Sequence, residues 1–397
     1  MRFLPKLLNK AVKSGTLTLI EPDGNRTSFG EPDGSKPVTM KIHDKSLDWK
    51  IAFNPELKTA EAYMDGTLTF EDGEVYDLLT LFYRNRRHFD HSANMIFWSG
   101  VARSMKRLHQ HNPISKSRAN VKHHYDLKHD VFDLFLDEDK QYSCAYFPSG
   151  DETLEEAQTA KKSHIISKLN LKPGQKVLDI GCGWGGMALQ IAATEDVTVK
   201  GITLSDNQAR IARQRAEEAG VSDRVSFEIC DYRELDEKFD RIVSVGMLEH
   251  VGAPHLKEYF LTVRNMLGPD GVALVHSIST KSPPGVTGPF IRKYIFPNGY
   301  SPALSEIVAA IEPTGLWVLD VEVWRKHYGF TLNEWRKRFA ERRDEAVAMY
   351  DERFARMWEF YLAASEGVFM YGSSCVVQLQ IGRQRDGVPL SRDYMYD

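Results

Sequence analysis

The sequence predicts an α/β fold: a mostly parallel sheet with helices on both faces, preceded by a small α+β domain. Three observations support this prediction. A glycine-rich turn at residues 181–186 follows an apolar strand and leads directly into a helix. Strand and helix patterns alternate from about residue 169 onward. The first hundred or so residues instead contain short alternating stretches separated by Asp-Gly pairs at 23–24 and 33–34.

The expected organisation is a first domain at residues 1–110, a linker at 111–122 and a second domain at 123–397. In the first domain we expect strands at 15–20, 38–42 and 49–53 and helices at 55–63 and 76–87. In the second domain we expect strands at 176–180, 199–204, 225–230, 241–246, 272–277, 317–323 and 376–381. The helices expected there are 186–193, 206–219, 254–266 and 302–311, with a charged helical insertion at 332–362.

Length and composition are those of a soluble protein with two domains. The chain has 397 residues, 42% of them hydrophobic and 27% charged, which is enough for at least one sizeable core. It shows no apolar run of membrane-spanning length and no signal-peptide pattern. The four cysteines, at positions 144, 182, 230 and 375, match neither a metal site nor a disulfide framework. We therefore expect no metal and a reducing, cytoplasmic setting.

Two features of the N-terminal part suggest contact with a membrane, and each has a simpler explanation. Residues 1–13 resemble a basic amphipathic helix, with apolar residues set against Lys6, Lys10 and Lys13. The same helix can instead cover its own domain. Residues 84–128 carry ten Lys/Arg against two acids, together with six of the 13 histidines. Such a window attracts anionic lipid or nucleic acid, or is a solvated connector.

The run VLDIGCGWGG at 177–186 is the most informative motif of the chain. Glycines let the backbone turn tightly against a bulky ligand, and the following helix directs its free N–H groups toward that ligand. The spacing differs from that of a phosphate-binding loop, and the loop has no basic residue for a pyrophosphate. A nucleoside without phosphates therefore fits better. In such sheets ligands bind beyond the carboxyl ends of the strands, where the strand order reverses.

Further segments of the chain help to identify the ligand of this loop. They are QYSCAYF at 141–147, GITLSDNQ at 201–208, DYR at 231–233, SVGMLEH at 244–250 and YIFPNG at 294–299. Together they resemble the cyclopropane-fatty-acid synthase family of S-adenosylmethionine-dependent methyltransferases, over roughly residues 121–381. The resemblance implies a class I methyltransferase sheet of Rossmann-like type. It also implies methylene transfer from S-adenosylmethionine to the cis double bond of unsaturated phospholipid acyl chains, forming a cyclopropane ring.

The resemblance also implies which residues contact S-adenosylmethionine. They are Tyr142 and Ser143 at its methionine part, Asp179, Gly181 and Gly183 in the floor, Thr203, Leu204 and Gln208 around the ribose, and Asp231 and Tyr232 beside the adenine. Side-chain chemistry agrees, because a carboxylate at Asp231 can accept from the adenine amino group and an amide at Gln208 suits ribose hydroxyls. For Asp179 the alternative is a carboxylate that caps a helix or orders a loop.

The reaction needs two functions from the protein. A cis alkene that attacks the electrophilic sulfonium methyl becomes a carbocation, which aromatic faces can stabilise and a base must deprotonate. The resemblance implies a bicarbonate ion as that base, held by Cys144, Glu249, His276, the backbone of Ile278, and Tyr328. The carboxylate can accept the bicarbonate hydroxyl, while the imidazole, phenol and backbone N–H can donate. The alternatives are direct deprotonation by Glu249, a Cys144 that only packs, and a His276 that is a satisfied core histidine.

One position departs from the family pattern. Many members carry a cysteine in the helix before the last strand, where this chain has Ser365. Since the mechanism above needs no protein nucleophile, we expect the replacement to be harmless.

Several functions stay open on the sequence. The nearest alternative is a methyltransferase that adds a methyl or methylene branch to acyl chains without closing a ring. A small-molecule N-methyltransferase and a non-catalytic lipid-binding protein are more distant. As partner we expect unsaturated phospholipid in an anionic membrane surface, with the protein peripherally associated with the inner face. We expect no nucleic acid, because the chain shows no recognition motif. The family suggests a homodimer.

Overall fold

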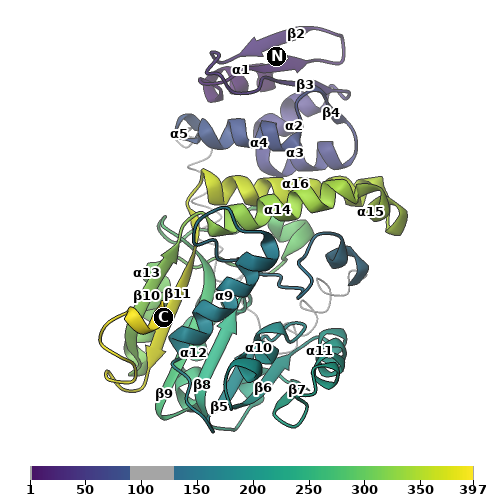
Figure 1. The fold of residues 1–397 in the computed structure, drawn as a ribbon. Helices are drawn as coiled ribbons and strands as arrows, with labels where there is room; N and C mark the ends of the chain where they lie inside the picture. The colour runs from purple at the N-terminus through teal and green to yellow at the C-terminus, as the bar shows by residue number, and fades with distance from the viewer. Residues whose placement is uncertain (1, 90–128, 397) are drawn as a thin grey trace. The chain divides into compact units, whose positions relative to one another are not determined.

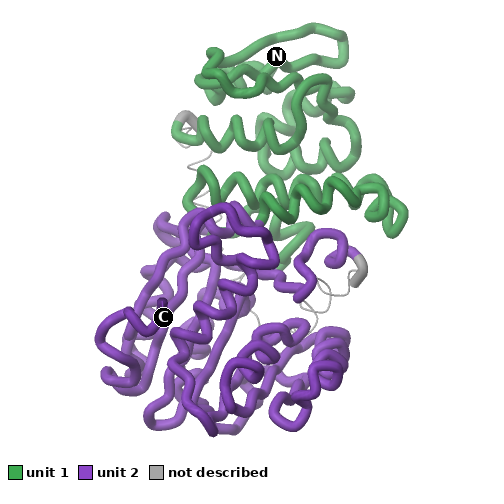
Figure 2. The backbone as a smooth tube through the Cα atoms, in the orientation of Figure 1, with its two compact units in different colours: residues 1–106, 286–297, 332–373 green, residues 107–285, 298–331, 374–397 purple. Residues whose placement is uncertain are grey.

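The chain forms two compact units, each built from separate stretches of sequence (Figure 2). The computed structural model describes residues 2–89 and 129–396, so the linker at 111–122 and most of the basic window at 84–128 lie outside the described residues. The first unit comprises residues 1–106, 286–297 and 332–373, and the second comprises 107–285, 298–331 and 374–397. The stretch 123–397, expected to be one domain, therefore contributes two segments to the N-terminal unit.

The first unit contains a four-stranded sheet of order β2-β1-β3-β4 (Figure 1). Its strands are β1 (Leu17–Ile20), β2 (Arg26–Phe29), β3 (Val38–Ile42) and β4 (Leu68–Asp72). Its N-terminal helices are α1 (Phe3–Ala11), α2 (Leu47–Phe53), α3 (Pro55–Met64), α4 (Val75–Arg84) and α5 (Arg86–Phe89). The charged run at 332–362 is helical as predicted, within α14 (His327–Glu341), α15 (Arg343–Met349) and α16 (Glu352–Met370).

The strand predicted at 49–53 is wrong, because this segment belongs to helix α2. Apolar residues at 47, 49, 51 and 53 alternate as in a strand, but they also lie at i, i+4 spacing. The helix buries Leu47 and Ile51 and leaves Trp49 and Phe53 exposed. Helix α1 buries Leu4 and covers its own domain, as the simpler interpretation expects, while Phe3 of the same helix stays exposed.

The second unit contains a seven-stranded sheet of order β10-β11-β9-β8-β5-β6-β7. Its strands are β5 (Lys176–Ile180), β6 (Thr198–Thr203), β7 (Val225–Ile229), β8 (Phe239–Val245), β9 (Leu267–Thr280), β10 (Trp317–Trp324) and β11 (Ser374–Gly382). Strands β5 to β9 pair in parallel and β11 is antiparallel to both neighbours, which confirms a mostly parallel sheet. The chain runs outward from β5 to β7 and then returns to β8, so the strand order reverses between β5 and β8.

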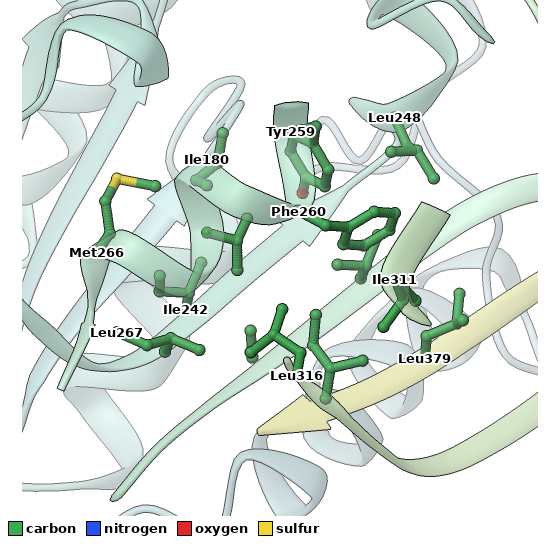
Figure 3. Packing of buried hydrophobic residues seen from close by; sticks show 14 of the residues in the cluster. Ile180, Ile242, Leu248, Tyr259, Phe260, Met266, Leu267, Ile311, Leu316 and Leu379 are labelled. Carbon is green, nitrogen blue, oxygen red and sulfur yellow. The ribbon is translucent and has the colours of Figure 1, made fainter. Parts of the chain in front are cut away.

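Two hydrophobic clusters cover the two faces of this sheet. The helices are α9 (Leu154–Leu169), α10 (Gly186–Thr194), α11 (Asp206–Glu218), α12 (Leu256–Met266) and α13 (Leu304–Ile311). Ile242 of β8 packs with α12 and α13 (Figure 3). The next residue, Val243, packs with α9, α10 and α11. Successive residues of one strand therefore enter opposite cores, as the pleat of a sheet requires.

Among the described residues, no helix combines the length and the apolar character that crossing a membrane requires.

Candidate active site

The glycine-rich loop leaves β5 at the point where the strand order reverses. Gly181, Gly183 and Gly185 have φ of +79°, +54° and +88°, in the region that favours glycine. A Cβ on Gly185 would lie 2.8 Å from the ring of Phe227, whereas a Cβ on Gly183 would meet no described atom within 4 Å. Gly185 is therefore needed for packing, and Gly183 borders open space at the end of the sheet.

Asp179 lies one residue before the end of β5 and is 2% exposed. Its Oδ2 has no hydrogen-bond partner among the described residues, and burial raises its pKa to about 7. Helix α10, which follows the loop, has Gly185 at its N-cap and no side-chain cap. Asp179 therefore does not cap that helix, and its buried acceptor is available to a ligand that brings a donor.

The end of β6 holds the residues expected around the ribose. Thr203 Oγ1 donates to Oε1 of Gln208 at 2.8 Å, and both residues are buried. Ser205 caps helix α11 by accepting from the Gln208 backbone N–H at 3.3 Å. Leu204, between them, is half-buried. Because the Gln208 carbonyl is engaged, its amide NH₂ is the end that can donate to a hydroxyl.

Asp231, after β7, is paired within its own motif. Its Oδ1 accepts from Arg233 Nε at 2.9 Å and its Oδ2 accepts from Nη2 at 2.7 Å. The same guanidinium lies 5.5 Å from the centroid of the Tyr232 ring, which packs edge-on against Tyr259 at 5.5 Å. Arg233 was not predicted as a site residue, although it stands in the DYR motif. A carboxylate oxygen keeps a second acceptor position when one is occupied, so Asp231 can still bind an amino group.

The segment with Tyr142, Ser143 and Cys144 is tied down by a buried lysine that the sequence analysis missed. Lys161 of α9 donates to Ser143 Oγ at 2.9 Å and to Oε1 of Gln141 at 2.6 Å. The Lys161 side chain is fully buried, and burial lowers its pKa to about 8. The Tyr142 ring packs edge-on against the ring of Phe132, with 5.1 Å between the two centroids.

The loop that carries Cys144 is tied to helix α14, which carries Tyr328. Cys144 is buried, which raises the pKa of its thiol far above the ordinary value, and its Sγ donates to the Ala145 carbonyl at 3.3 Å. The Ala145 N–H donates to Thr331 Oγ1 at 3.0 Å. Thr331 lies one turn after Tyr328, which is buried. The thiol is therefore protonated, which suits packing and weak donation rather than nucleophilic attack.

Glu249 lies in a short helical turn after β8, 8% exposed. Its Oε1 accepts from the backbone N–H of Ile278 at 2.6 Å. Its Oε2 has no partner among the described residues, and burial raises its pKa to about 7. The Ile278 N–H, which the resemblance implies as a donor to the anion, donates to Glu249 in this structure, because buried polar groups pair with an available partner. Its role toward a bound anion stays a prediction.

His276 lies in β9, two residues before Ile278, and is buried and hydrogen-bonded, so the structure is compatible both with a satisfied core histidine and with a site residue. Its ring packs edge-on against Trp324, with centroids 5.2 Å apart, and its Nδ1 is 3.1 Å from Nε2 of Gln378. Trp324 also stacks on Tyr146 at 4.7 Å. Trp324 therefore joins His276 to the loop that carries Cys144.

The structure links Glu249, His276 and the loop with Cys144 through neighbouring residues of the second unit, and it connects Tyr328 to that loop through Thr331. Strand β9 carries His276 and the amide that binds Glu249, while the loop before α9 carries Cys144. The charge of Lys161 influences the pKa values of Asp179, Cys144 and His276. One buried lysine therefore lies among the expected cofactor floor and the expected anion cradle.

A family model described as mycolic acid cyclopropane synthetase matches residues 112–379. The chain belongs to this family. It is accordingly an S-adenosylmethionine-dependent methyltransferase with a class I sheet, as the motifs predicted. A second model, a domain of unknown function, matches residues 3–94 of this family member.

Several relatives span nearly the whole chain. The cyclopropane-fatty-acyl-phospholipid synthase of Escherichia coli K12 is 39% identical over 344 residues, covering 85% of this chain and 86% of the relative. The tuberculostearic acid methyltransferase UfaA1 of Mycobacterium tuberculosis is 38% identical over 404 residues, covering 96% and 90%. A probable fatty acid methyltransferase of Pseudomonas putida is 35% identical over 385 residues, covering 94% of each chain.

Solved structures match the methyltransferase part. The cyclopropane synthase MmaA2 from Mycobacterium tuberculosis is 34% identical with a TM-score of 0.64, covering 68% of this chain and 99% of that one. The mycolic acid cyclopropane synthase CmaA1, complexed with SAH and CTAB, gives the same identity, TM-score and coverage. Coclaurine N-methyltransferase, at 18% identity and a TM-score of 0.66, shares the fold.

Proposed function

We propose that this enzyme transfers a methylene group from S-adenosylmethionine to the cis double bond of unsaturated phospholipid acyl chains and closes a cyclopropane ring. The observation that carries the proposal is the Glu249 carboxylate: buried, with a pKa near 7 and an unpartnered oxygen, beside β9 at the ligand edge of the sheet. A group of this kind can receive a proton from a carbocation or from an anion that has done so. The E. coli relative carries the corresponding name.

S-adenosylmethionine supplies the electrophilic one-carbon group. The described residues fit it at two points. The unpartnered Asp179 oxygen suits the cationic amino group of the methionine part. That amino group would give the buried oxygen the hydrogen bond that it lacks. The open space beside Gly183 lets the backbone approach the ligand without a Cβ in between. Gln208 would donate to a ribose hydroxyl, and Asp231 and Tyr232 would border the adenine.

The residues near Glu249 also fit a small anion that carries a proton, as bicarbonate does. A bare anion would be repelled by the carboxylate, whereas a hydroxyl can donate to the free Oε2. His276 and Tyr328 would supply donors on the other side. The Ile278 amide would take part indirectly, by holding Glu249. Direct deprotonation by Glu249 is the competing route, and its raised pKa permits it.

A second candidate is methyl or methylene branching without ring closure. It is favoured by two relatives named fatty acid or tuberculostearic acid methyltransferases, which match 94% and 96% of this chain. The two reactions share a carbocation and differ in which carbon loses a proton, so the branched product keeps a double bond. The residues around Glu249 are therefore compatible with both.

Product analysis tests the reaction. Purified full-length enzyme is incubated with S-adenosylmethionine and vesicles of an unsaturated phospholipid, with and without removal of carbon dioxide. We expect acyl chains heavier by one CH₂ per double bond, cyclopropane proton signals by NMR, and turnover that bicarbonate restores but chloride does not. Methyl-branched products would establish the second candidate. Turnover that is insensitive to bicarbonate would assign the base to Glu249, and unchanged acyl chains would refute both.

We also propose that the first unit docks on anionic membrane. Phe3 of α1 lies 5.7 Å from Phe53 of α2, between ring centroids, and Trp49 is one helical turn from Phe53. These side chains are 37%, 60% and 51% exposed. Trp and Phe at a surface insert readily into the interfacial region of a bilayer, and Lys50, which follows Trp49 in α2, adds a positive charge that favours anionic lipid. Such docking would make the enzyme peripheral to the inner face of the membrane.

Vesicle sedimentation with the double variant W49A/F53A tests this surface. We expect binding to anionic vesicles to fall about tenfold or more, because two interfacial aromatic anchors are lost, while S-adenosylmethionine affinity stays unchanged. The matched control is Trp317→Ala, which removes a tryptophan of similar exposure, 52%, from the second unit. Equal loss in both variants, or no loss in the double variant, would contradict docking through Trp49 and Phe53.

A further inference from the structure

Four side chains form a continuous chain of hydrogen bonds that ends at His276. Strand pairing places Gln378 opposite His276 and Glu322 opposite Gln378, in one row across β9, β11 and β10. Lys168, in the last turn of α9, contacts this row. His276, Gln378 and Lys168 are each at most 2% exposed. Polar groups this deeply buried must be satisfied by one another.

The Glu322 end of the row is charged. Lys168 Nζ donates to Oε2 of Glu322 and, at 2.7 Å, to Oε1 of Gln378. The same Glu322 oxygen lies 2.8 Å from Nε2 of His164. Burial alone would raise the pKa of Glu322, but the hydrogen bonds from His164 and Lys168 hold it at about 2. The hydrogen bond to this carboxylate opposes the lowering of the Lys168 pKa by burial, and Nζ lies against the carboxylate as an ammonium group does.

The donors and acceptors of the row have only one consistent arrangement. An ammonium group can only donate, so Gln378 must turn its carbonyl oxygen toward Lys168. Its NH₂ then faces Nδ1 of His276, at 3.1 Å. Since an amide NH₂ can only donate, Nδ1 must accept. Burial and the nearby positive lysines hold the pKa of His276 well below its ordinary value, so the ring is neutral and its single proton lies on Nε2.

We infer that Lys168 and Gln378 are positioning residues, which fix His276 as the Nε2–H tautomer and so make it a hydrogen-bond donor toward the bound anion. The donor role rests on the proposed function, whereas the tautomer follows from the hydrogen-bond row alone. In this arrangement Glu322 anchors the lysine, the lysine orients the amide, and the amide selects the imidazole nitrogen that carries the proton. The wrong tautomer would present a lone pair to an anion and repel it.

The chain offers a matched control for Gln378. Gln380 lies two residues further along β11, is equally buried, and donates to the Lys168 carbonyl at 2.5 Å and to the Tyr394 hydroxyl at 2.8 Å. No bond from it to His276 is present among the described residues. Gln380→Met therefore removes a buried amide from the same strand without touching the imidazole.

Nitrogen NMR of the full-length protein, labelled with ¹⁵N-histidine, reads the tautomer directly. The His276 signal is the one missing from the His276→Asn spectrum. We expect wild type and Gln380→Met to show a proton on Nε2 and none on Nδ1. In Gln378→Glu the new carboxylate can only accept, so we expect Nδ1 to become protonated. Turnover of Gln378→Glu should fall at least tenfold with S-adenosylmethionine affinity within twofold, while Gln380→Met stays within threefold.

A proton on Nδ1 of His276 in the wild type overturns the inference, whatever the variants show. The inference therefore remains testable even if Gln378→Glu does not fold. A Gln378→Glu variant that switches the tautomer but keeps full turnover overturns the positioning role. Failure of the proposed function looks different, because the wild type would then form no methylene-bearing product while its His276 tautomer remained as expected.

Discussion

The two halves of the central sheet hold their polar residues in different ways. In the β5–β7 half, Asp179, Thr203 and Asp231 stand at or just after the carboxyl ends of strands whose buried faces are apolar. In the β9–β11 half, His276 and Gln378 lie within the strands and bond across them. The first arrangement keeps polar groups available to a ligand. The second commits them to one another, so that changing one residue alters its neighbours.

The largest effect is expected at Glu249, which lies where the two halves meet. Glu249→Gln keeps an oxygen for the Ile278 N–H but removes the carboxylate that can take a proton. We expect kcat to fall roughly 10²–10³-fold, the usual contribution of a general acid–base group. Steady-state turnover on phospholipid vesicles measures this change, and calorimetry should show S-adenosylmethionine binding within twofold of wild type. A kcat within threefold of wild type would remove Glu249 from the chemistry.

Asp179→Asn probes the half that binds the cofactor. Loss of a charge-assisted contact should weaken S-adenosylmethionine binding about 10–100-fold, with a smaller change in kcat at saturation. Calorimetric titration gives the dissociation constant. Unchanged affinity would assign Asp179 to the structure of the loop alone.

The same variant has a pH signature in the unliganded protein. Burial raises the Asp179 pKa from 3.8 to about 7, so between these values the folded state holds a proton that the unfolded chain has lost. The stability linked to that proton is complete below pH 3.8 and is lost as the pH rises through 7. We therefore expect Asp179→Asn to gain stability relative to wild type between pH 5 and pH 8. Thermal unfolding of wild type and Asp179→Asn at pH 5 and at pH 8 tests this. Burial also raises the pKa of Glu249, but Glu249 is present in both proteins and contributes equally to both.

The contrast between the halves also explains what the sequence could predict. All seven strands of the large sheet were predictable, because apolar runs between turn residues are characteristic of buried strands. Helix α9 was missed because its buried face carries Gln158, Lys161, His164 and Lys168, which removes the apolar stripe. The cofactor loop was predictable from local motifs. The Lys168 row was not, since lysine is usually exposed and its partners lie 154 and 210 residues away.

Two of the three buried lysines of α9, Lys161 and Lys168, allow the halves to be perturbed separately. Lys161→Met releases Ser143 and Gln141, so we expect S-adenosylmethionine affinity to fall about tenfold with kcat little changed. Lys168→Met frees the Gln378 amide, so we expect the opposite pattern, a roughly tenfold lower kcat with affinity unchanged. The dissociation constant of S-adenosylmethionine and kcat are measured for both variants. Identical changes in the two variants would mean that the halves act as one unit.

The smallest effect is expected outside both halves, at Ser365 of α16 in the first unit. The family resemblance implies a cysteine here, but the proposed chemistry passes its proton to an anion or to Glu249 and needs no protein nucleophile. Ser365→Ala and Ser365→Cys should therefore both keep kcat within about twofold of wild type, as is usual for substitutions away from reacting groups. A collapse of turnover in Ser365→Ala, with S-adenosylmethionine binding intact and rescue by Ser365→Cys, would place a reactive side chain in the first unit and require a different route for the proton.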